Sequence, residues 1–327
     1  MKAGCCLGAL LALTTACGGL YSRNPDGGNQ ILTGLGPPTC MRVLSDAIEV
    51  HSPTGAAAFQ DISGLAFDQN RNLHVLSRGS ADDSFVNVMR PPSYGLARTY
   101  GKGALGPVRD LVLDSSDRAY VVENFESGPP RISKFDPLGA PAGTFTANGS
   151  VQDEGLALAI DGSGMLNVAG LSKIFRYGLD GTFLDAYGVS GKGVGKVLLP
   201  TGLAWDNVGQ AIWVADLFQN FVEKYTPGNS TQLAQFGGRG TTNGKFDGNE
   251  PTGNTFWGPN RIAVDAEGKV YASDPLASRL QKFAPNGSYL GQFDFGSSNL
   301  FGAIAIHPDT GVLYVGRGST IDVICPF

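Results

Sequence analysis

The sequence of 327 residues is poor in charged residues, and those that it has form no basic stripe. Asp, Glu, Lys and Arg make up 16% of the chain, and the formal net charge is −5. Proteins that bind nucleic acids hold the phosphates with clustered Lys and Arg, so this composition argues against a nucleic-acid partner. Long helical patterns rich in Ala, Glu, Lys and Leu are also missing. Short runs of Val, Ile, Phe, Tyr and Leu between Gly, Asn, Asp and Pro instead predict an all-β protein.

The common sequence motifs of catalysis are absent as well. No G-x-S-x-G elbow occurs, and no two cysteines have the spacing of a zinc site. The Gly-rich run GVSGKGVGKVLL at 188–199 lacks the first Gly of a P-loop and the Ser or Thr that follows its Lys. This run therefore predicts a turn rather than a phosphate site.

The beginning of the chain has the layout of an export signal. In residues 1–16, MKAGCCLGALLALTTA, one Lys precedes an apolar segment, and small residues precede Cys17. The segment is too short to span a membrane as a mature helix. It resembles a bacterial lipoprotein signal, in which the cysteine becomes the lipidated first residue; plain secretion and an uncleaved anchor are the alternatives. We expect an exported protein, either a lipoprotein of the outer membrane or cell surface, or a secreted one.

One short pattern recurs along the rest of the chain. It consists of an apolar strand that ends in Asp, a polar turn and a second apolar strand, as in TGLAWDNVGQAIWVAD at 201–216. The first strands end at Asp68, Asp114, Asp161, Asp206, Asp265 and His307. A repeat of about 40 to 50 residues with four strands predicts a six-bladed β-propeller of four-stranded antiparallel blades. Asp at such a position caps its own turn, so we interpret the repeated Asp residues as turn caps rather than calcium ligands.

The repeated units resemble NHL repeats. The resemblance rests on GLAWD and IWVADLFQNFVEKY within 202–225 and on RIAVDAEGKVYASDPLASRLQKFAPNGSYLGQF at 261–293. It covers about residues 60 to 327. The resemblance implies a propeller in which each blade covers the apolar face of the next, and it implies no particular activity.

The last unit lacks a fourth strand, and a spare strand, MRVLSDAIEV at 41–50, precedes the first unit. We predict that this strand completes the last blade and closes the ring. Cys40 and Cys325 would then lie side by side, so that a disulfide between them replaces the missing hairpin; two unrelated buried thiols are the alternative. The predicted organisation is a signal peptide at 1–16, a flexible tether rich in Gly, Asn and Pro at 17–39, and the propeller at 40–327.

The interval between Asp206 and Asp265 is longer than the others because it contains an insertion at 237–259. Phe246, Phe256 and Trp257 make this insertion partly apolar. A loop of this length is unusual in a compact fold. We expect it to be a lid, a surface that binds a partner, or a segment packed against the outside of the fourth and fifth blades.

The beginnings of the first strands meet at one mouth of the central channel, which is the usual binding face of a propeller. The residues that we expect there are Ser63, Arg109, Asp110, Glu154, Thr201, Asn260 and Arg261. Their mixed charges and amides suit a polar ligand or a cation. Gluconolactonase-type propellers bind a divalent metal in the channel through Glu, Asn and Asp, and this resemblance makes Glu154, Asn260 and Asp110 the candidate ligands of a metal.

Other related propellers, a zinc-dependent peptide-amidating lyase and a streptogramin lyase, use histidines near the channel. His51, His74 and His307 do not occupy equivalent positions in three blades, which argues against a three-histidine metal centre. We therefore favour a non-catalytic binding or scaffold module without a cofactor, whose channel face meets a protein, peptide or glycan and whose only membrane contact is a lipid anchor. A metal-dependent enzyme of the lactonase or lyase type is the main alternative, and a structural envelope protein is a third.

Overall fold

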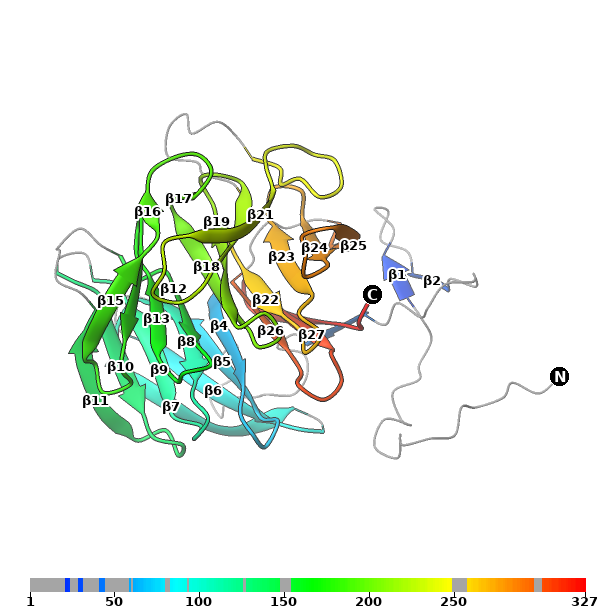
Figure 1. The fold of residues 1–327 in the computed structure, drawn as a ribbon. Coiled ribbons are helices and arrows are strands. Elements are labelled where there is room, and N and C mark those ends of the chain that lie inside the picture. The colour runs from blue at the N-terminus through cyan, green and yellow to red at the C-terminus, as the bar shows by residue number, and fades with distance from the viewer. Residues whose placement is uncertain are drawn as a thin grey trace.

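The computed structural model describes residues 59, 61–79, 83–92, 94–125, 128–147, 154–248, 258–296 and 302–327, and the backbone of residues 21–23, 29–31 and 41–44. These residues form strands and turns, and none of them is helical (Figure 1). A helix long and apolar enough to cross a membrane is accordingly not found in this part of the chain. The predictions for residues 1–16, Cys17 and His51 lie outside the described residues.

Six four-stranded antiparallel sheets confirm the predicted six-bladed propeller. They are blade 1 with β4 (Asp61–Phe67), β5 (Leu73–Arg78), β6 (Ser84–Arg90) and β7 (Gly95–Leu105); blade 2 with β8 (Val108–Leu113), β9 (Ala119–Glu123), β10 (Arg131–Phe135) and β11 (Pro141–Thr146); blade 3 with β12 (Ala157–Ile160), β13 (Leu166–Ala169), β14 (Ile174–Tyr177) and β15 (Phe183–Tyr187); blade 4 with β18 (Pro200–Asp206), β19 (Ala211–Asp216), β20 (Phe221–Tyr225) and β21 (Gln232–Gly237); blade 5 with β22 (Ile262–Val264), β23 (Val270–Asp274), β24 (Arg279–Phe283) and β25 (Tyr289–Asp294); and blade 6 with β26 (Ala303–Ile306), β27 (Leu313–Arg317), β28 (Thr320–Ile324) and β3 (Met41–Leu44). Two short pairs lie outside the blades: β1 (Tyr21–Arg23) with β2 (Asn29–Ile31), and β16 (Val189–Ser190) with β17 (Lys196–Val197).

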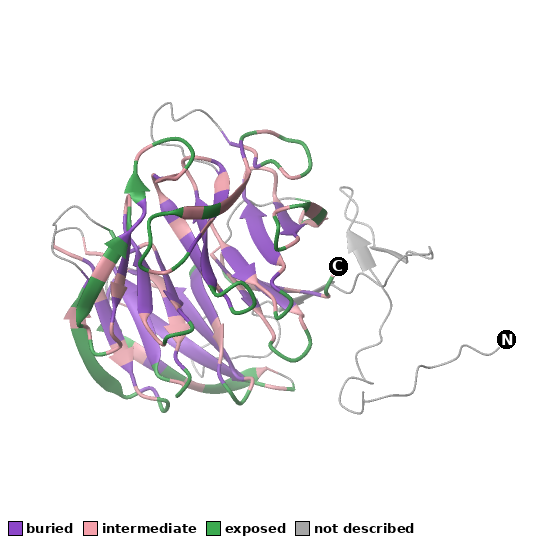
Figure 2. Ribbon diagram, in the orientation of Figure 1, coloured by how far each residue is buried: buried purple, intermediate pink, exposed green. Residues whose placement is uncertain are grey.

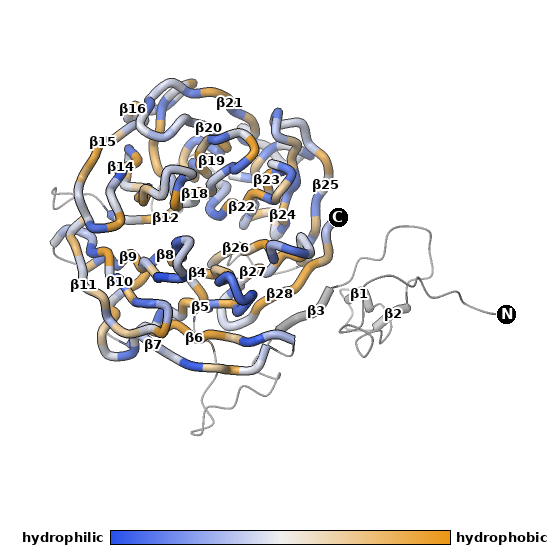
Figure 3. The backbone as a smooth tube through the Cα atoms, turned by 60° about the horizontal axis from the view of Figure 1, so that its bottom comes forward, coloured by the Kyte–Doolittle hydropathy of each residue, from blue (hydrophilic) through white to orange (hydrophobic). Residues whose placement is uncertain are grey.

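The first strand of every blade lies at the centre of the ring. Each of β4, β8, β12, β18, β22 and β26 contacts the first strand of the next blade, and β26 contacts β4. Figure 3 shows these six strands around the middle of the molecule. The fourth strands lie outside and are the most exposed, as the burial patterns of β11 and β15 and Figure 2 show.

The hydrophobic core consists of six clusters, one for each interface between neighbouring blades. For example, Leu76 and Val88 of blade 1 pack with Leu111 and Val121 of blade 2. The remaining clusters join blades 2 and 3, 3 and 4, 4 and 5, 5 and 6, and 6 and 1. A single blade would leave both faces exposed, so stacking around the axis is what buries the apolar side chains.

The repeated Asp residues cap the turn after the first strand in blades 1 to 5, as predicted. Asp114 Oδ1 accepts hydrogen bonds from the backbone N–H groups of Ser116 and Arg118, at 2.8 and 3.0 Å. Asp68, Asp161, Asp206 and Asp265 accept equivalent bonds from the residues that follow them. A carboxylate held by its own turn fixes the hairpin and has no need of a calcium ion.

Blade 6 has the strand order β26-β27-β28-β3, in which β3 is antiparallel to β28. Cys325 is disulfide-bonded, and the other four cysteines lie outside the described residues. Nothing is described of the side chains of β3, so closure of the ring by this strand and the Cys40–Cys325 pairing stay predictions.

The described part of the insertion packs against blades 4 and 5. Phe246 is fully buried in the core cluster of these two blades, with its ring centroid 5.9 Å from that of Phe283. Of the three interpretations, packing is therefore the one that fits residues 237–248. Phe256 and Trp257 lie outside the described residues.

Candidate functional site: the mouth of the central channel

A β-bulge at the start of the first strand recurs in three blades. The pairing between the first and second strands skips one residue at Ser63 in β4, at Arg109 in β8 and at Thr201 in β18. A bulge redirects its side chain relative to the regular pleat of the strand. Three of the seven residues predicted at the channel mouth therefore lie at a β-bulge.

Arg261, which directly precedes β22, connects blade 5 to three other blades. Its Nε donates to the carbonyl oxygen of Gly302 in blade 6 at 2.5 Å. Its Nη1 donates to the carbonyl oxygen of Thr201 in blade 4 at 2.8 Å, and its Nη2 to that of Arg109 in blade 2 at 3.4 Å. The guanidinium thus spans the channel mouth and holds first strands from across the ring.

Asp110 faces this arginine from blade 2, which lies opposite blade 5 in a ring of six. Its carboxylate accepts the backbone N–H groups of Leu111 and Leu158, both at 2.8 Å. Burial raises the pKa of Asp110, and the charge of Arg261 and these two hydrogen bonds oppose that shift. Burial lowers the pKa of Arg261, and the charge of Asp110 opposes it. The two residues, called the channel pair below, therefore stabilise each other's charge.

The other four blades leave room for the channel pair. Counted back from the end of the first strand, the positions of Asp110 and Arg261 are occupied elsewhere by Gly64, Ala157, Gly202 and Ala303. At Gly202, even a Cβ atom would lie 3.2 Å from the Cα of Arg261. Small residues in four blades and charged ones in two opposite blades fill the mouth without a clash.

A cavity of about 270 Å³ follows the first strands from the channel pair into the channel. Asp110 and Arg261 are the charged residues among those that line it, and Leu, Ile, Val, Ala, Gly and Trp205 make up the rest. The side chains along the wall are thus apolar, and the charged side chains lie at the end where the channel pair is.

Two ion pairs on blades 1 to 3 face the solvent at the mouth. Arg109 Nη2 lies 3.8 Å from Glu154 Oε2, and these side chains are 40% and 51% exposed. Arg78 Nη1 lies 3.3 Å from Asp61 Oδ2, with 34% and 51% exposed. The guanidinium of Arg78 also donates to the carbonyl oxygen of Val108 in blade 2. Asp61 is a mouth residue that the sequence did not predict. The start of β4 at Asp61 becomes visible only from its pairing with Arg78 of β5.

The remaining predicted mouth residues differ in whether other groups of the protein contact their side chains. Asn260 Oδ1 accepts the hydroxyl of Ser273 at 2.5 Å. The hydroxyls of Ser63 and Thr201 are buried and have no hydrogen-bond partner among the described residues. The candidate metal ligands are likewise engaged, since Glu154 pairs with Arg109 and Asp110 accepts two backbone N–H groups. Within the described ranges, no three residues of the types His, Cys, Asp and Glu are grouped so that they could hold a metal ion.

The two described histidines lie away from the channel lining. His74 is buried in β5, where its Nδ1 lies 3.0 Å from the hydroxyl of Tyr100 and its Nε2 3.5 Å from Asp68. His307 follows β26 and packs edge-on against the ring of Phe67 at 5.0 Å. Burial lowers the pKa of both imidazoles.

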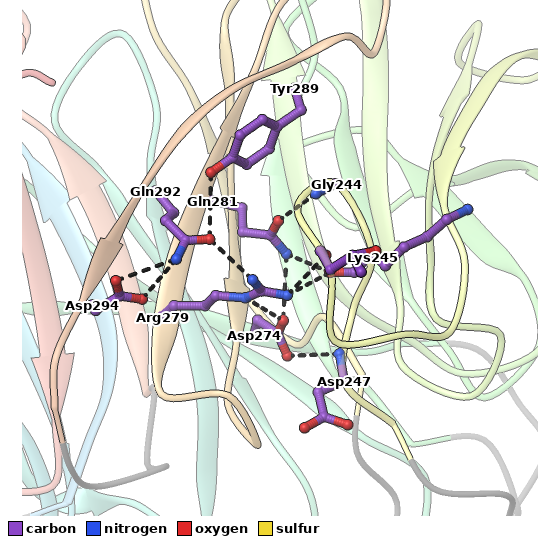
Figure 4. Close-up of polar contacts among 10 residues, drawn as sticks. Gly244, Lys245, Asp247, Asp274, Arg279, Gln281, Tyr289, Gln292 and Asp294 are labelled. Carbon is purple, nitrogen blue, oxygen red and sulfur yellow. Dashed lines mark hydrogen bonds and ion pairs between the residues drawn. The ribbon is translucent and has the colours of Figure 1, made fainter.

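Blade 5 carries a second polar cluster, which the sequence analysis did not predict (Figure 4). Asp274 at the end of β23 accepts the Nε of Arg279 at 2.9 Å and the backbone N–H of Asp247 at 3.0 Å. Arg279 also donates to the carbonyl oxygen of Lys245, as does Gln281. This cluster fixes the insertion to the blade, and its signal in the sequence is the spacing of Asp, Arg and Gln in SDPLASRLQ at 273–281.

Comparison with known proteins supports the fold. No protein-family model and no curated protein matches the chain. A protein of unknown function from Bacteroides thetaiotaomicron VPI-5482 superposes with a TM-score of 0.65 at 15% identity, over 92% of this chain and 80% of that one. A streptogramin B lyase gives 0.59 at 11% identity, over 88% and 97%. A catalytically inactive histidine-to-alanine variant of virginiamycin B lyase from Staphylococcus aureus, with quinupristin, gives 0.57 at 12% identity, over 88% and 100%. At such identities the likeness extends to the fold alone.

Proposed function

We propose that the protein is an exported, lipid-anchored propeller of the NHL type that binds a protein, peptide or glycan at its channel mouth and performs no catalysis. The observation that carries this proposal is the exposed pair of Arg109 and Glu154 beside an Arg261 whose guanidinium is occupied by backbone carbonyls. Because Arg261 spans the mouth, a ligand would rest on this face rather than enter the channel.

The exposed ion pairs at the mouth suit a binding role because they cost little to open. A solvent-exposed pair contributes about 0–1 kcal/mol, so a ligand carboxylate can replace Glu154 beside Arg109 with little loss. The guanidinium fork presents parallel N–H groups to such a carboxylate, and the released Glu154 accepts from an amine or hydroxyl. Acidic peptides and charged glycans offer these groups.

We expect Arg109→Ala to weaken ligand binding without affecting stability. In an array of acidic peptides and glycans probed with the mature protein, signals bound by the wild type should fall by about tenfold or more, the size of one lost charge-assisted hydrogen bond. Arg71→Ala is the matched control, because Arg71 forms an equally exposed pair with Asp309 on another part of the surface. Equal binding by wild type and Arg109→Ala would remove the mouth as the binding face.

The competing interpretation, a metal-dependent lactonase or lyase, predicts a bound metal. Virginiamycin B lyase has a catalytically inactive histidine variant, whereas His74 and His307 of this chain lie outside the channel lining. We expect elemental analysis of protein purified without chelators to find no divalent metal in stoichiometric amount. One ion per chain that is lost on treatment with EDTA, and lost also in Glu154→Ala, would favour the enzyme over the binding module.

A further inference from the structure

The acid–arginine pair of blade 5 has counterparts in two other blades. At the junction of the second and third strands, the pairs are Asp274–Arg279 in blade 5, Glu123–Arg131 in blade 2 and Arg317–Asp322 in blade 6. The nitrogen-to-oxygen distances are 2.9 Å in blade 5 and 2.7 Å in blade 2. All three carboxylates are fully buried. In each of these blades an arginine compensates a buried negative charge, as burial of a charge requires.

Blade 4 has the acid but lacks the arginine. Asp216 ends β19 as Asp274 ends β23, but the arginine position holds Phe221, and the position two residues later holds Glu223. Glu223 pairs with Val214 across the sheet and Asp216 with Phe221, so that the two acids lie diagonally on one face, within reach of each other. Both are fully buried.

Asp216 holds a Gly-rich segment of the channel face, residues 191–199. Its carboxylate accepts the backbone N–H of Leu198 at 2.7 Å and the side chain of Gln219 at 2.9 Å. Gln219 in turn accepts the N–H of Gly193 at 2.7 Å, and Gln232 on β21 accepts that of Gly195 at 3.1 Å. The segment is therefore fixed through side chains that surround Asp216.

Glu223 is less well satisfied. One of its oxygens accepts the hydroxyl of Tyr225 at 3.0 Å, and the other is buried without a hydrogen-bond partner among the described residues. The groups facing the two acids are uncharged: Tyr225 on β20, Gln232 and Gln235 on β21, and Gln219 after β19. Tyr187 on β15 of blade 3 packs against the ring of Tyr225. Neither acid forms an ion pair with a Lys or Arg of the described part of the chain.

We propose that a proton on Glu223 replaces the missing arginine of blade 4, and that loss of this proton releases segment 191–199 from the channel face. With the proton present, Glu223 is neutral beside the ionised Asp216. Without it, two negative charges lie together in a buried site, and the structure relieves the repulsion by letting water reach Asp216. The hydrogen bonds from Gly193, Gly195 and Leu198 are then lost.

The direction of the pH dependence follows from the burial of Glu223. Burial and the neighbouring Asp216 raise the pKa of Glu223 to about 8. Because the folded state binds this proton more tightly than the unfolded chain, stability decreases as the pH rises from the ordinary range of a Glu toward pH 8 and levels off above it. Over that interval the folding equilibrium constant falls by up to tenfold per pH unit.

Glu223→Gln tests the proposal directly, because Gln is neutral at every pH. Urea unfolding of the mature protein between pH 5.5 and 9 should show a slope for the wild type that the variant lacks, a difference of up to tenfold in equilibrium constant per pH unit. Trypsin should cleave the wild type after Lys192 and Lys196 several-fold faster than it cleaves the variant at pH 9, and at equal rates at pH 6. Identical slopes and identical cleavage at pH 9 would overturn the proposal.

Two further variants move the transition in opposite directions. Tyr225→Phe removes the hydroxyl that lowers the pKa of Glu223, so the transition should move to higher pH. Phe221→Arg restores the arginine of the other blades and should move the transition to lower pH. If Tyr225→Phe leaves the midpoint unchanged, Glu223 is not the titrating group; this variant keeps the test decisive if Phe221→Arg fails to fold.

Discussion

An Arg261→Met variant is expected to be less stable than the wild type by about 2–4 kcal/mol in urea unfolding followed by tryptophan fluorescence. Methionine keeps the apolar length of the side chain but loses the hydrogen bonds to the carbonyl oxygens of Gly302, Thr201 and Arg109. It also leaves the carboxylate of Asp110 without the cation that faces it across the channel. The size of the effect reflects a partly buried pair whose hydrogen bonds connect five of the six blades.

A double variant separates the two causes of this loss. Asp110→Asn in the Arg261→Met background removes the unpaired charge, so it should recover part of the lost stability even though a second native residue has been replaced. Arg109→Ala is the control for arginine replacement at the mouth, and its effect should stay below about 1 kcal/mol because its pair with Glu154 is exposed. A loss of similar size in Arg109→Ala and Arg261→Met would mean that Arg261 has no special part in joining the blades.

The fold could be predicted from the sequence because every blade is a four-stranded antiparallel sheet with the same local sequence pattern. The apolar strands and the turn between them lie close together in all six units, and five units also have the capping Asp. Asp114 shows how local it is, since the carboxylate binds the backbone of its own turn. Burial between blades then follows, because a sheet with two apolar faces has to be covered on both.

The sequence predicted which residues lie at the channel mouth but not which contacts they make there. The residues that begin each first strand were identified, yet their roles depend on which blades face each other across the axis. Asp110 and Arg261 are separated by most of three blades in the sequence and meet only once the ring is closed. The carbonyl groups that hold Arg261 belong to the backbone, which every residue has, so the identities of Gly302 and Thr201 do not predict these hydrogen bonds. The candidate metal ligands Glu154, Asn260 and Asp110 rest on a resemblance to gluconolactonase-type propellers, whereas their partners in the protein appear only in three dimensions.

The difference between blades 4 and 5 is visible in the sequence but acquires meaning from burial. Phe221 and Glu223 in DLFQNFVEKY stand where DPLASRLQKF has Arg279 and Gln281. On an exposed loop such an exchange would matter little. Because Asp216 and Asp274 are fully buried, the presence or absence of the arginine decides whether the acid is compensated by a cation or by a proton.

Arg279→Phe copies the composition of blade 4 into blade 5, and we expect it to cost about 3–5 kcal/mol at pH 8. Arg279 is 4% exposed and Asp274 is fully buried, so the variant leaves a carboxylate in the interior without a cation. The carbonyl oxygen of Lys245 and the side chain of Gln292 lose a donor at the same time. Urea unfolding measures the loss, and faster tryptic cleavage after Lys245 reports the release of the insertion.

The pH dependence of Arg279→Phe identifies the unpaired acid as the cause. Burial raises the pKa of Asp274 to about 6 even with Arg279 beside it, and removal of the arginine raises it further. A buried acid with a raised pKa destabilises the folded protein as the pH rises from the ordinary range of the acid toward the raised value. The loss of stability of Arg279→Phe relative to the wild type should therefore be markedly smaller at pH 5 than at pH 8. Asp274→Asn in the variant background should restore part of the stability at pH 8 and little at pH 5. A deficit that is equal at both pH values would assign it to the lost packing and hydrogen bonds of Arg279, and the buried charge of Asp274 would then not be the reason for the arginine in blade 5.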